Sequence, residues 1–476
     1  RFCHKAVLDP LKRFEDQLTG KHANTQIPKV VGLERIATIT GDREADSGAR
    51  FFWENVTGKR SVAFGGNSVS EHFNDPKDFT AMLDSREGPE TCNTYNMLRL
   101  TSQLFASRPM AVYADFYERA LYNHILASIH PEKSGYVYFT PIRPAHYRVY
   151  SQPDKGFWCC VGTGMENPGR YGEFIYAQAT NGLYVNLFIA SEITVAHLGL
   201  TLRQETAFPD HPRTTLTLKL QKPAEFTLYL RHPGWVAAGA FAVRVNGNSV
   251  DVPSTPASYP ELRREWRDGD RVEIELPMRA TVERLPDGSD WIAILHGPIV
   301  LASPAGTNDL RGLYADDSRM GHVAHGPLVP RDRVPVLLAS ASDVLRHIEP
   351  DPAAGPMHYR LKDIVEPPVA DGLPLMPFLR LHDQRYQMYW QLTTREELTA
   401  KRERLAAKTL DNSEPGQFVE KRYAIPAEDL SGATDDRITI EFSAKPGPRY
   451  VGVYDVRLMK PDSRPDAAQP GTPVAK

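Results

Sequence analysis

Apolar residues near the start of the chain recur three and four positions apart, which is the spacing of one face of a helix. Leu8, Leu11, Phe14 and Leu18 keep this spacing, and Gly20 follows them as a stop signal. The pattern predicts a first helix that reaches almost to Gly20. The same periodicity predicts further helices at about 27–40, 89–105 and 111–129.

Residues 51–88 break this periodicity and are rich in Gly, Asn, Asp and Ser. They predict a long loop between the second and third helices. A structureless connection of that length inside a compact domain usually carries function.

The hydrophobic pattern changes after about Tyr176 to short segments that alternate or are rich in β-branched residues. Such segments are typical of strands. Asn246-Gly247 and Asp268-Gly269 are turn signals of the hairpin type. Together they predict a β-sandwich. The predicted strands lie at 183–189, 215–220, 226–230, 241–245, 272–276, 438–442 and 451–458.

The β-rich part also contains less regular stretches. Residues 303–345 and 400–436 are rich in Asp, Arg and Pro, so we expect insertions or boundaries there. Residues 461–476 are expected to be a frayed tail. The predicted domains are a helical domain over 1–180, a β-sandwich over 181–305 and a second β-rich region over 306–476.

Composition places the chain among globular proteins, with 476 residues of which 41% are hydrophobic and 24% charged. The net charge of -3 supplies no broad electrostatic footprint for nucleic acid or an anionic membrane. The longest apolar run, 291–303, is shorter than the ~20 residues that span a bilayer. Because the chain begins at Arg1 and shows no signal-peptide core, we expect a processed product or a fragment.

The four cysteines are too few for a disulfide scaffold in so long a chain. Glu90 and Cys92 lie at a predicted helix start, and Cys159 and Cys160 are adjacent. Three thiolates and one carboxylate would make a tetrahedral zinc site, if a sharp turn lets both adjacent sulfurs face one ion. On spacing alone, a buried Cys92 beside a buried or oxidised cysteine pair is the commoner arrangement.

Several polar and aromatic residues are candidates for a sugar-cleaving site. A glycosidase needs one proton donor and one nucleophile or base beside the bond it breaks. Glu71 lies in the polar loop, and Glu87 and Glu166 compete with it for the role of proton donor. His22 stands at a helix start, and Tyr138 lies either in the core or in the wall of a sugar pocket.

Five motifs follow one another in the first 170 residues and together resemble those of glycoside hydrolase families 127 and 146. These families are the zinc-dependent β-L-arabinofuranosidases. The motifs RHPGW at 231–235 and LHGPIV at 295–300 also resemble the family's β-sandwich. The five motifs are KHANTQIPK at 21–29, GGNSVSEHF at 65–73, GPETCNTYNMLRL at 88–100, YADFYERALYNHILASIHP at 113–131 and FWCCVGTGMEN at 157–167.

The resemblance implies an α+β multidomain protein in which an (α/α)6-type helical barrel precedes β-sandwich domains. Such a barrel has more helices than can be counted before the strands begin, so we expect only its second half here. The β-rich part should be a scaffold without catalytic groups. We expect its suspicious exceptions, Arg231, His232 and Trp235, to pack against the helices.

The resemblance also implies a retaining glycoside hydrolase that releases L-arabinofuranose from β-L-arabinofuranosides of plant cell-wall glycans. Cys159 would be the nucleophile and Glu71 the acid/base. By the same resemblance, zinc would be held by Glu90, Cys92, Cys159 and Cys160, and the sugar would contact His22 and Tyr138.

Two other functions stay open. One is a non-catalytic, zinc-stabilised carbohydrate-binding protein with the same fold. The other is an α/α-barrel lyase or hydrolase that acts on uronic acid glycans, for which Arg143, His146, Tyr147 and Arg148 are candidate groups. The expected partner is an arabinose-containing plant oligo- or polysaccharide, without nucleic acid or membrane. We expect a bacterial protein that is periplasmic or secreted, with the cytoplasm as the alternative.

Overall fold

The computed structural model describes residues 4–331 and 333–406. The chain divides into two units, and the first of them, Arg1–Glu397, holds the sheets discussed below and the helices that precede the last described strand. No helix among the described residues is both long enough and apolar enough to cross a membrane. Three predicted features lie outside the described residues: the strands at 438–442 and 451–458 and the tail at 461–476. The irregular stretch predicted at 400–436 lies outside them beyond Ala406.

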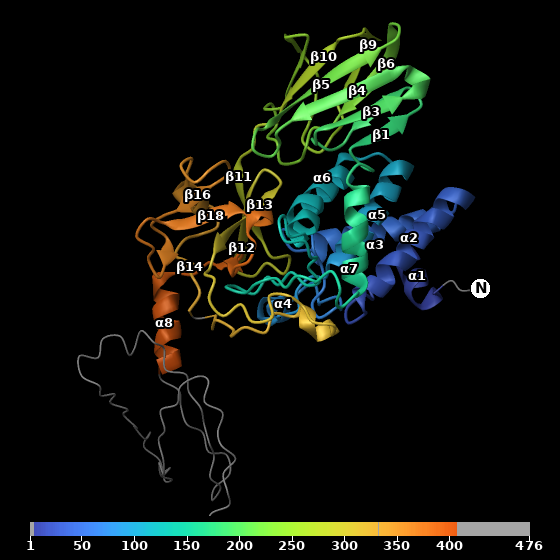
Figure 1. Ribbon diagram of the computed structural model, residues 1–476. Coiled ribbons are helices and arrows are strands. Elements are labelled where there is room, and N and C mark those ends of the chain that lie inside the picture. Colours follow the sequence, from blue (N-terminus) through green and yellow to red (C-terminus); the bar gives the residue numbers. More distant parts are fainter. Residues whose placement is uncertain (1–3, 332, 407–476) are drawn as a thin grey trace, which may run out of the picture. The chain divides into compact units, whose positions relative to one another are not determined.

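Helices fill the first part of the chain (Figure 1). They pack against one another through their apolar faces. The second and fifth helices lie side by side, and the fifth also contacts the sixth and seventh. The helices are α1 (Lys5–Lys12), α2 (Ala23–Thr40), α3 (Arg43–Lys59), α4 (Thr80–Asp84), α5 (Thr91–Ser107), α6 (Ala111–Ala120), which continues as a π-helix (Leu121–Ile125) and a 3-10 turn (Leu126–Ser128), and α7 (Cys159–Arg170).

The predicted loop over 51–88 is wrong in its first part, because α3 extends to Lys59. Asp42 caps this helix, since its carboxylate accepts hydrogen bonds from two backbone N–H groups of the first turn. Phe52 and Trp53 are buried on its inner face. Burial of this face against α1 and α2 outweighs the polar composition that suggested a loop.

The first helix is shorter than predicted. α1 ends at Lys12, and Phe14 adopts a left-handed backbone conformation with φ of 60°. Its side chain is 60% exposed, so it does not continue the buried face. Leu18 is buried from the loop that follows.

Two sheets form the middle β-rich domain, and their strands are antiparallel except for the parallel pair β2 and β6. The hairpin at Asn246-Gly247 is confirmed, with both residues at positive φ. The turn at Asp268-Gly269 instead joins strands of different sheets. One sheet has the order β1 (Tyr176–Ala179), β2 (Gly182–Val185), β6 (Ala224–Leu230), β9 (Glu261–Trp266), and the other β3 (Ser191–Val195), β4 (Leu200–Thr206), β5 (Arg213–Leu220), β10 (Arg271–Glu275), β7 (Ala242–Val245), β8 (Asn248–Val250).

A third domain is built on a larger antiparallel sheet, and its last described strands precede α8 (Arg395–Ala406). The stretch at 303–345, which was predicted to be irregular, lies within this domain and contributes only short elements. The sheet has the order β11 (Ala280–Arg284), β12 (Trp291–His296), β13 (Ile299–Pro304), β18 (Leu373–Pro377), β16 (Tyr359–Leu361), β15 (Ile348–Pro350), with β19 (Tyr386–Gln387) beside β13, β20 (Trp390–Gln391) beside β12, and a separate pair of β14 (Val336–Leu337) and β17 (Val365–Glu366).

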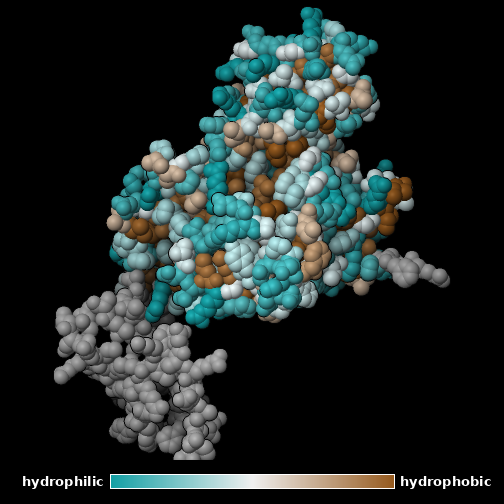
Figure 2. Space-filling view, in the orientation of Figure 1, coloured by the Kyte–Doolittle hydropathy of each residue, from teal (hydrophilic) through white to brown (hydrophobic). Residues whose placement is uncertain are grey.

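The middle domain is joined to the helices by a buried ion cluster. Arg231 is fully buried and pairs with Asp115 and Glu118 of α6. Trp235 donates its indole N–H to Glu118 at 2.8 Å. Hydrophobic side chains also gather where the two parts meet (Figure 2). The expected packing of Arg231 and Trp235 against the helices is confirmed.

The expectation for His232 is wrong. Its ring stacks on Phe241 and its nitrogens meet Ser254 and the carbonyl of Val236, all within the middle domain. The reason is geometric, because successive residues of an extended segment point to opposite sides. A helical part followed by β-rich domains is confirmed, whereas the exact domain boundaries stay a prediction.

Candidate metal centre and active site

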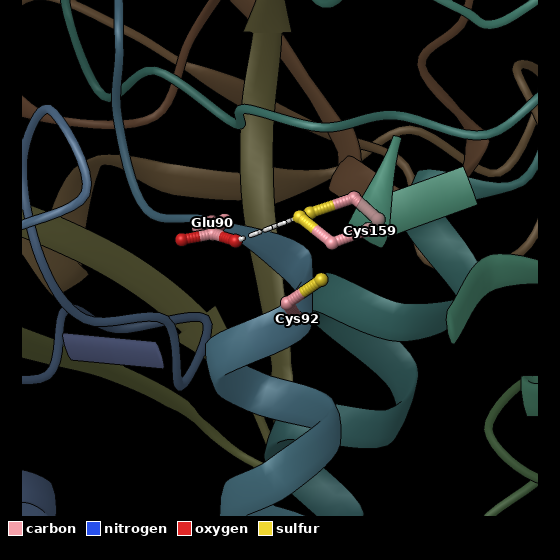
Figure 3. A group of neighbouring side chains, drawn as sticks. Glu90, Cys92 and Cys159 are labelled. Atoms are coloured by element: carbon pink, nitrogen blue, oxygen red, sulfur yellow. Dashed lines mark hydrogen bonds between the residues drawn. The ribbon is translucent and has the colours of Figure 1, made fainter. Parts of the chain in front are cut away.

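The N-termini of α5 and α7 meet at a cluster of four side chains (Figure 3). Glu90 holds the N-cap position of α5 but makes no capping hydrogen bond with its side chain. It turns instead toward Cys159 and Cys160, which open α7. The sharp turn expected at the cysteine pair lies earlier, at Gly156 with φ of 63°.

The cluster has the composition and size of a metal site. One donor atom each from Glu90, Cys92, Cys159 and Cys160 lies within 4.8 Å of the others. All four atoms therefore lie within about 3 Å of a common point, close to the ~2.3 Å of a Zn–S bond. Because these residues come from two motifs that lie far apart in the sequence, the tertiary fold assembles the group. It could hold a metal ion.

A buried carboxylate oxygen supports this fit. Oε1 of Glu90 lies 3.5 Å from the sulfurs of both Cys159 and Cys160, whereas Oε2 is buried without a hydrogen-bond partner. An unpaired buried carboxylate oxygen is costly, so a cation beside it would be strongly favoured. Cys92 and Cys160 are also buried, and Cys159 is exposed.

The pKa of Cys159 is shifted in the opposite direction from those of its neighbours in the cluster. Hydrogen bonds from Cys160 and Cys92 lower the pKa of Cys159 to about 2. Burial raises the pKa of Glu90 and of Cys160. Cys159 also stands at the first position of α7, where the helix dipole favours a thiolate. The thiolate of the cluster is therefore the one that reaches solvent.

Glu71 is held in an unusual loop next to this cluster. Ser68, Ser70 and Glu71 all have positive φ, at 80°, 45° and 68°. Such a backbone persists only where the surroundings hold it. Here the carbonyl of Glu71 accepts from Ala23 N at 2.8 Å, and Ser70 N donates to the carbonyl of Glu87 at 2.9 Å.

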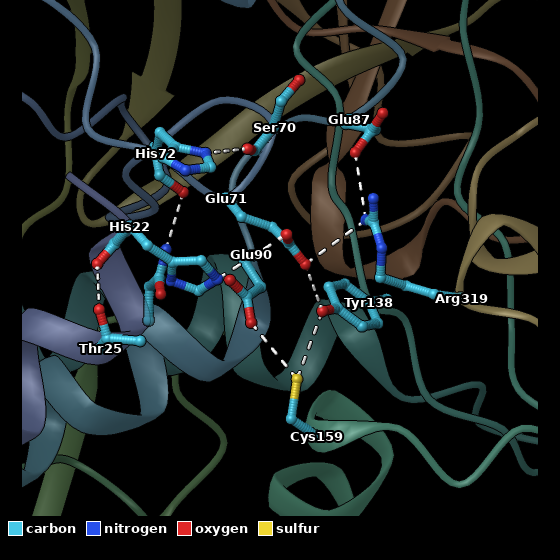
Figure 4. Close-up of polar contacts among 12 residues, drawn as sticks. His22, Thr25, Ser70, Glu71, His72, Glu87, Glu90, Tyr138, Cys159 and Arg319 are labelled. Carbon is cyan, nitrogen blue, oxygen red and sulfur yellow. Dashed lines mark hydrogen bonds and ion pairs between the residues drawn. The ribbon is translucent and has the colours of Figure 1, made fainter. Parts of the chain in front are cut away.

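Tyr138 connects Glu71 to Cys159 (Figure 4). Its hydroxyl donates to Glu71 Oε1 at 2.7 Å and lies 3.4 Å from the sulfur of Cys159. The other oxygen of Glu71 faces Nε2 of His22 at 3.8 Å. The structure thus brings these predicted residues together. Burial raises the pKa of Tyr138, which keeps its hydroxyl a donor.

Other candidates from the sequence lie elsewhere. Glu166 forms a surface ion pair with Arg170 one helical turn away. Arg148 is buried and donates to the carbonyls of Ala127 and Leu381. Its companions Arg143, His146 and Tyr147 are also buried, and Arg143 and Tyr147 bond backbone carbonyls of the irregular stretch at 303–345. Arg143, Tyr147 and Arg148 thus use their polar groups in contacts with the backbone of distant segments.

Sequence reasoning missed Arg319, which comes from the third domain. Its Nη1 lies 3.4 Å from Glu71 Oε1 and 3.3 Å from Glu87 Oε2. Glu87 is therefore next to Glu71, and Arg319 joins the two carboxylates. No motif in the irregular stretch at 303–345 signals this contact.

Family comparisons agree with the motifs. The model of the β-L-arabinofuranosidase GH127 catalytic domain matches residues 1–173, and that of the GH127 middle domain matches 182–278. Together they span more than half of the chain. The chain belongs to the GH127 family. The predicted membership of the β-L-arabinofuranosidase glycoside hydrolases is confirmed. A third family model, a domain of unknown function, matches residues 281–392.

Individual relatives of this GH127 chain are distant. It is 27% identical over 295 residues to the non-reducing end β-L-arabinofuranosidase of Bifidobacterium longum subsp. longum. That match covers 56% of this chain and 43% of the relative, so the chain spans less than half the length of the curated protein.

Solved structures show the same fold. A GH127 β-L-arabinofuranosidase from Geobacillus stearothermophilus T6 aligns with a TM-score of 0.59 and 22% identity, over 81% of this chain and 62% of that one. A second GH127 β-arabinofuranosidase aligns with a TM-score of 0.58 and 21% identity, over 80% and 61%. The predicted α+β multidomain fold class is confirmed.

Proposed function

We propose that this GH127 chain is a retaining glycoside hydrolase that releases L-arabinofuranose from β-L-arabinofuranosides of plant cell-wall glycans. The observation that carries the proposal is the hydroxyl of Tyr138, which joins Glu71 to the exposed, thiolate-favouring Cys159. We propose an arabinose-containing oligo- or polysaccharide as the partner. A periplasmic or secreted location in a bacterium is part of the same proposal.

The separation of the two groups supports retention of configuration. The contacts through Tyr138 mean that the sulfur of Cys159 and Oε1 of Glu71 cannot be more than about 6 Å apart. Carboxyl pairs of retaining glycosidases are about 5–5.5 Å apart, and those of inverting enzymes about 6.5–9.5 Å. Inversion needs a water molecule between the sugar and the base, and a separation of about 6 Å or less leaves too little room for it.

Each residue then has a defined role. The sulfur of Cys159 attacks the anomeric carbon while Glu71 gives its proton to the departing oxygen. Glu71 next takes a proton from water, which displaces the sulfur from the sugar. His22 and Tyr138 flank Glu71 and are proposed to hold hydroxyl groups of the sugar.

We propose that the cation is zinc, held by Glu90 and the three cysteines. Zinc is bound by thiolate, imidazole and carboxylate in tetrahedral sites, which fits this donor set. When bound, it keeps its thiolate ligands ionised and fixed in place. The rest of the chemistry lies with Cys159, Glu71 and Tyr138.

A trapping experiment tests this assignment. The full chain is treated with a mechanism-based arabinofuranosyl inactivator, and the labelled peptide is mapped by mass spectrometry. We expect the label on Cys159 and none in Cys159→Ser, because a serine hydroxyl is a weak nucleophile here. Hydrolysis of an aryl β-L-arabinofuranoside is measured in parallel.

The controls separate the rival functions. Ser191→Ala, a hydroxyl change in the middle domain, should label as the parent does. A label on Glu71 or Glu90 would refute the role of Cys159. Zinc binding and sugar binding without label or turnover would favour the non-catalytic carbohydrate-binding protein.

A further inference from the structure

A segment of the third domain contacts residues of the candidate site and joins it to the rest of that domain. This bridging segment, residues 313–322, belongs to the part of the chain that matches a domain of unknown function. It exchanges two backbone hydrogen bonds with Tyr150. Asp317 of the segment accepts from Gly156 N at 3.1 Å and from the indole of Trp158 at 3.0 Å. These contacts attach it to the stretch that leads directly into Cys159.

The bridging segment presents Arg319 in a fixed conformation. Arg319 opens a short 3-10 turn, and the hydroxyl of Ser318 caps this turn by accepting from Gly321 N at 2.9 Å. Oδ1 of Asp316 in turn accepts from Ser318 N at 2.8 Å and from its hydroxyl at 2.7 Å. A Cβ on Gly321 would lie 2.1 Å from that same oxygen, so only glycine fits.

The guanidinium of Arg319 reaches the carboxylate proposed as acid/base. Its Nη1 stands between Glu71 and Glu87, at 3.4 Å and 3.3 Å (Figure 4). Its Cζ lies 5.9 Å from the ring centre of Phe139. Arg319 and Tyr138 approach the same oxygen, Oε1 of Glu71. Together they leave Oε2 directed toward His22.

We propose that the bridging segment is part of the active site, and that Arg319 is a positioning residue which orients the carboxyl group of Glu71 for proton transfer. The proposal rests on the proposed function of Glu71. It gives the domain of unknown function a role in the reaction, because that domain supplies the residue. Without Arg319, the carboxylates of Glu71 and Glu87 would face each other and Glu71 would turn away from Tyr138.

Kinetics of Arg319→Gln on two substrates test the proposal. A methyl β-L-arabinofuranoside needs protonation of its leaving oxygen, whereas a substrate with an acidic phenol needs little. We expect kcat to fall about 10–100-fold for the methyl glycoside and less than about threefold for the glycoside of the acidic phenol. KM should stay nearly unchanged for both substrates. Arg319→Lys should recover part of the lost kcat, since the lysine ammonium keeps the positive charge but lacks the planar guanidinium with its fixed donors.

A double variant shows whether Arg319 acts through Glu71. Glu71→Gln combined with Arg319→Gln should be no slower than Glu71→Gln alone. Arg311→Gln, which removes the same charge from a nearby exposed arginine, should match the parent. Additive losses, or an Arg319→Gln kcat within about twofold of the parent on the methyl glycoside, would overturn the inference.

Two further results complete the test. Normal turnover of the methyl glycoside by Glu71→Gln would refute the proposed function itself, so the two failures are distinguishable. Crystal structures of the parent and of Arg319→Gln give a readout independent of turnover. We expect the 2.7 Å contact between Tyr138 and Glu71 to be lost in the variant. A Glu71 carboxyl group in its original place would overturn the positioning role.

Discussion

Replacing Arg231 with methionine should destabilise the chain strongly. The guanidinium is fully buried, and it pairs with the buried Glu118 and with Asp115 at 2.6 Å. Methionine fills a similar volume but removes the charge, so the carboxylate of Glu118 stays buried without its cation. Among the described residues, the indole N–H of Trp235 is then the one group that still donates to that side chain. Breaking a buried pair in this way costs about 3–5 kcal/mol.

Urea unfolding, followed by tryptophan fluorescence, measures this cost. The matched control is Arg263→Met in the same domain, where the arginine is 70% exposed and pairs with Glu225 at 3.0 Å. An exposed pair of this kind contributes about 0–1 kcal/mol. We therefore expect a several-fold larger shift of the unfolding midpoint for Arg231→Met than for Arg263→Met.

A second substitution examines the cause of the loss. Burial raises the pKa of Glu118, and Arg231 opposes this shift. Arg231→Met combined with Glu118→Gln removes the stranded charge, so the double variant should be more stable than Arg231→Met alone. Equal midpoint shifts for Arg231→Met and Arg263→Met would refute the reasoning. A double variant as unstable as the sum of the two single changes would do the same.

Three other outcomes are expected. Elemental analysis of the reduced protein should find about one zinc per chain, and Cys92→Ser should lose most of it. Burial lowers the pKa of His124 and of His146 from 6.5 to about 3, so only the unfolded state gains protons below pH 6.5. The free energy of unfolding should therefore fall by about 2 kcal/mol per histidine between pH 6.5 and 5, measured by urea titration at each pH, and a flat profile would contradict this. Tyr138→Phe should lower kcat at least about tenfold on a methyl arabinofuranoside with an unchanged melting temperature.

The sequence by itself determined the parts of this protein that depend on local pattern. Alternating apolar residues located five of the ten strands of the middle domain, and the turn at Asn246-Gly247 followed from its preference for positive φ. The motifs around Glu90, Cys92 and the cysteine pair identified the family, because those residue types in that order are specific. Each of these signals lies within a few consecutive residues.

Other features depended on contacts between distant parts of the chain. The second half of α3 was predicted as part of a loop because its composition is polar. Its helical conformation depends on burial of its inner face against neighbouring helices. Arg319 lies 248 positions from Glu71, and Arg231 lies 113 positions from Glu118. The motif RHPGW drew attention to Arg231 but did not name its partners, and nothing in the local sequence distinguishes Arg319 from the exposed arginines of the chain. Burial and charge pairing are properties of the surroundings in space, so only the tertiary structure showed that Arg319 joins the site and that Asp115 and Glu118 are the partners of Arg231.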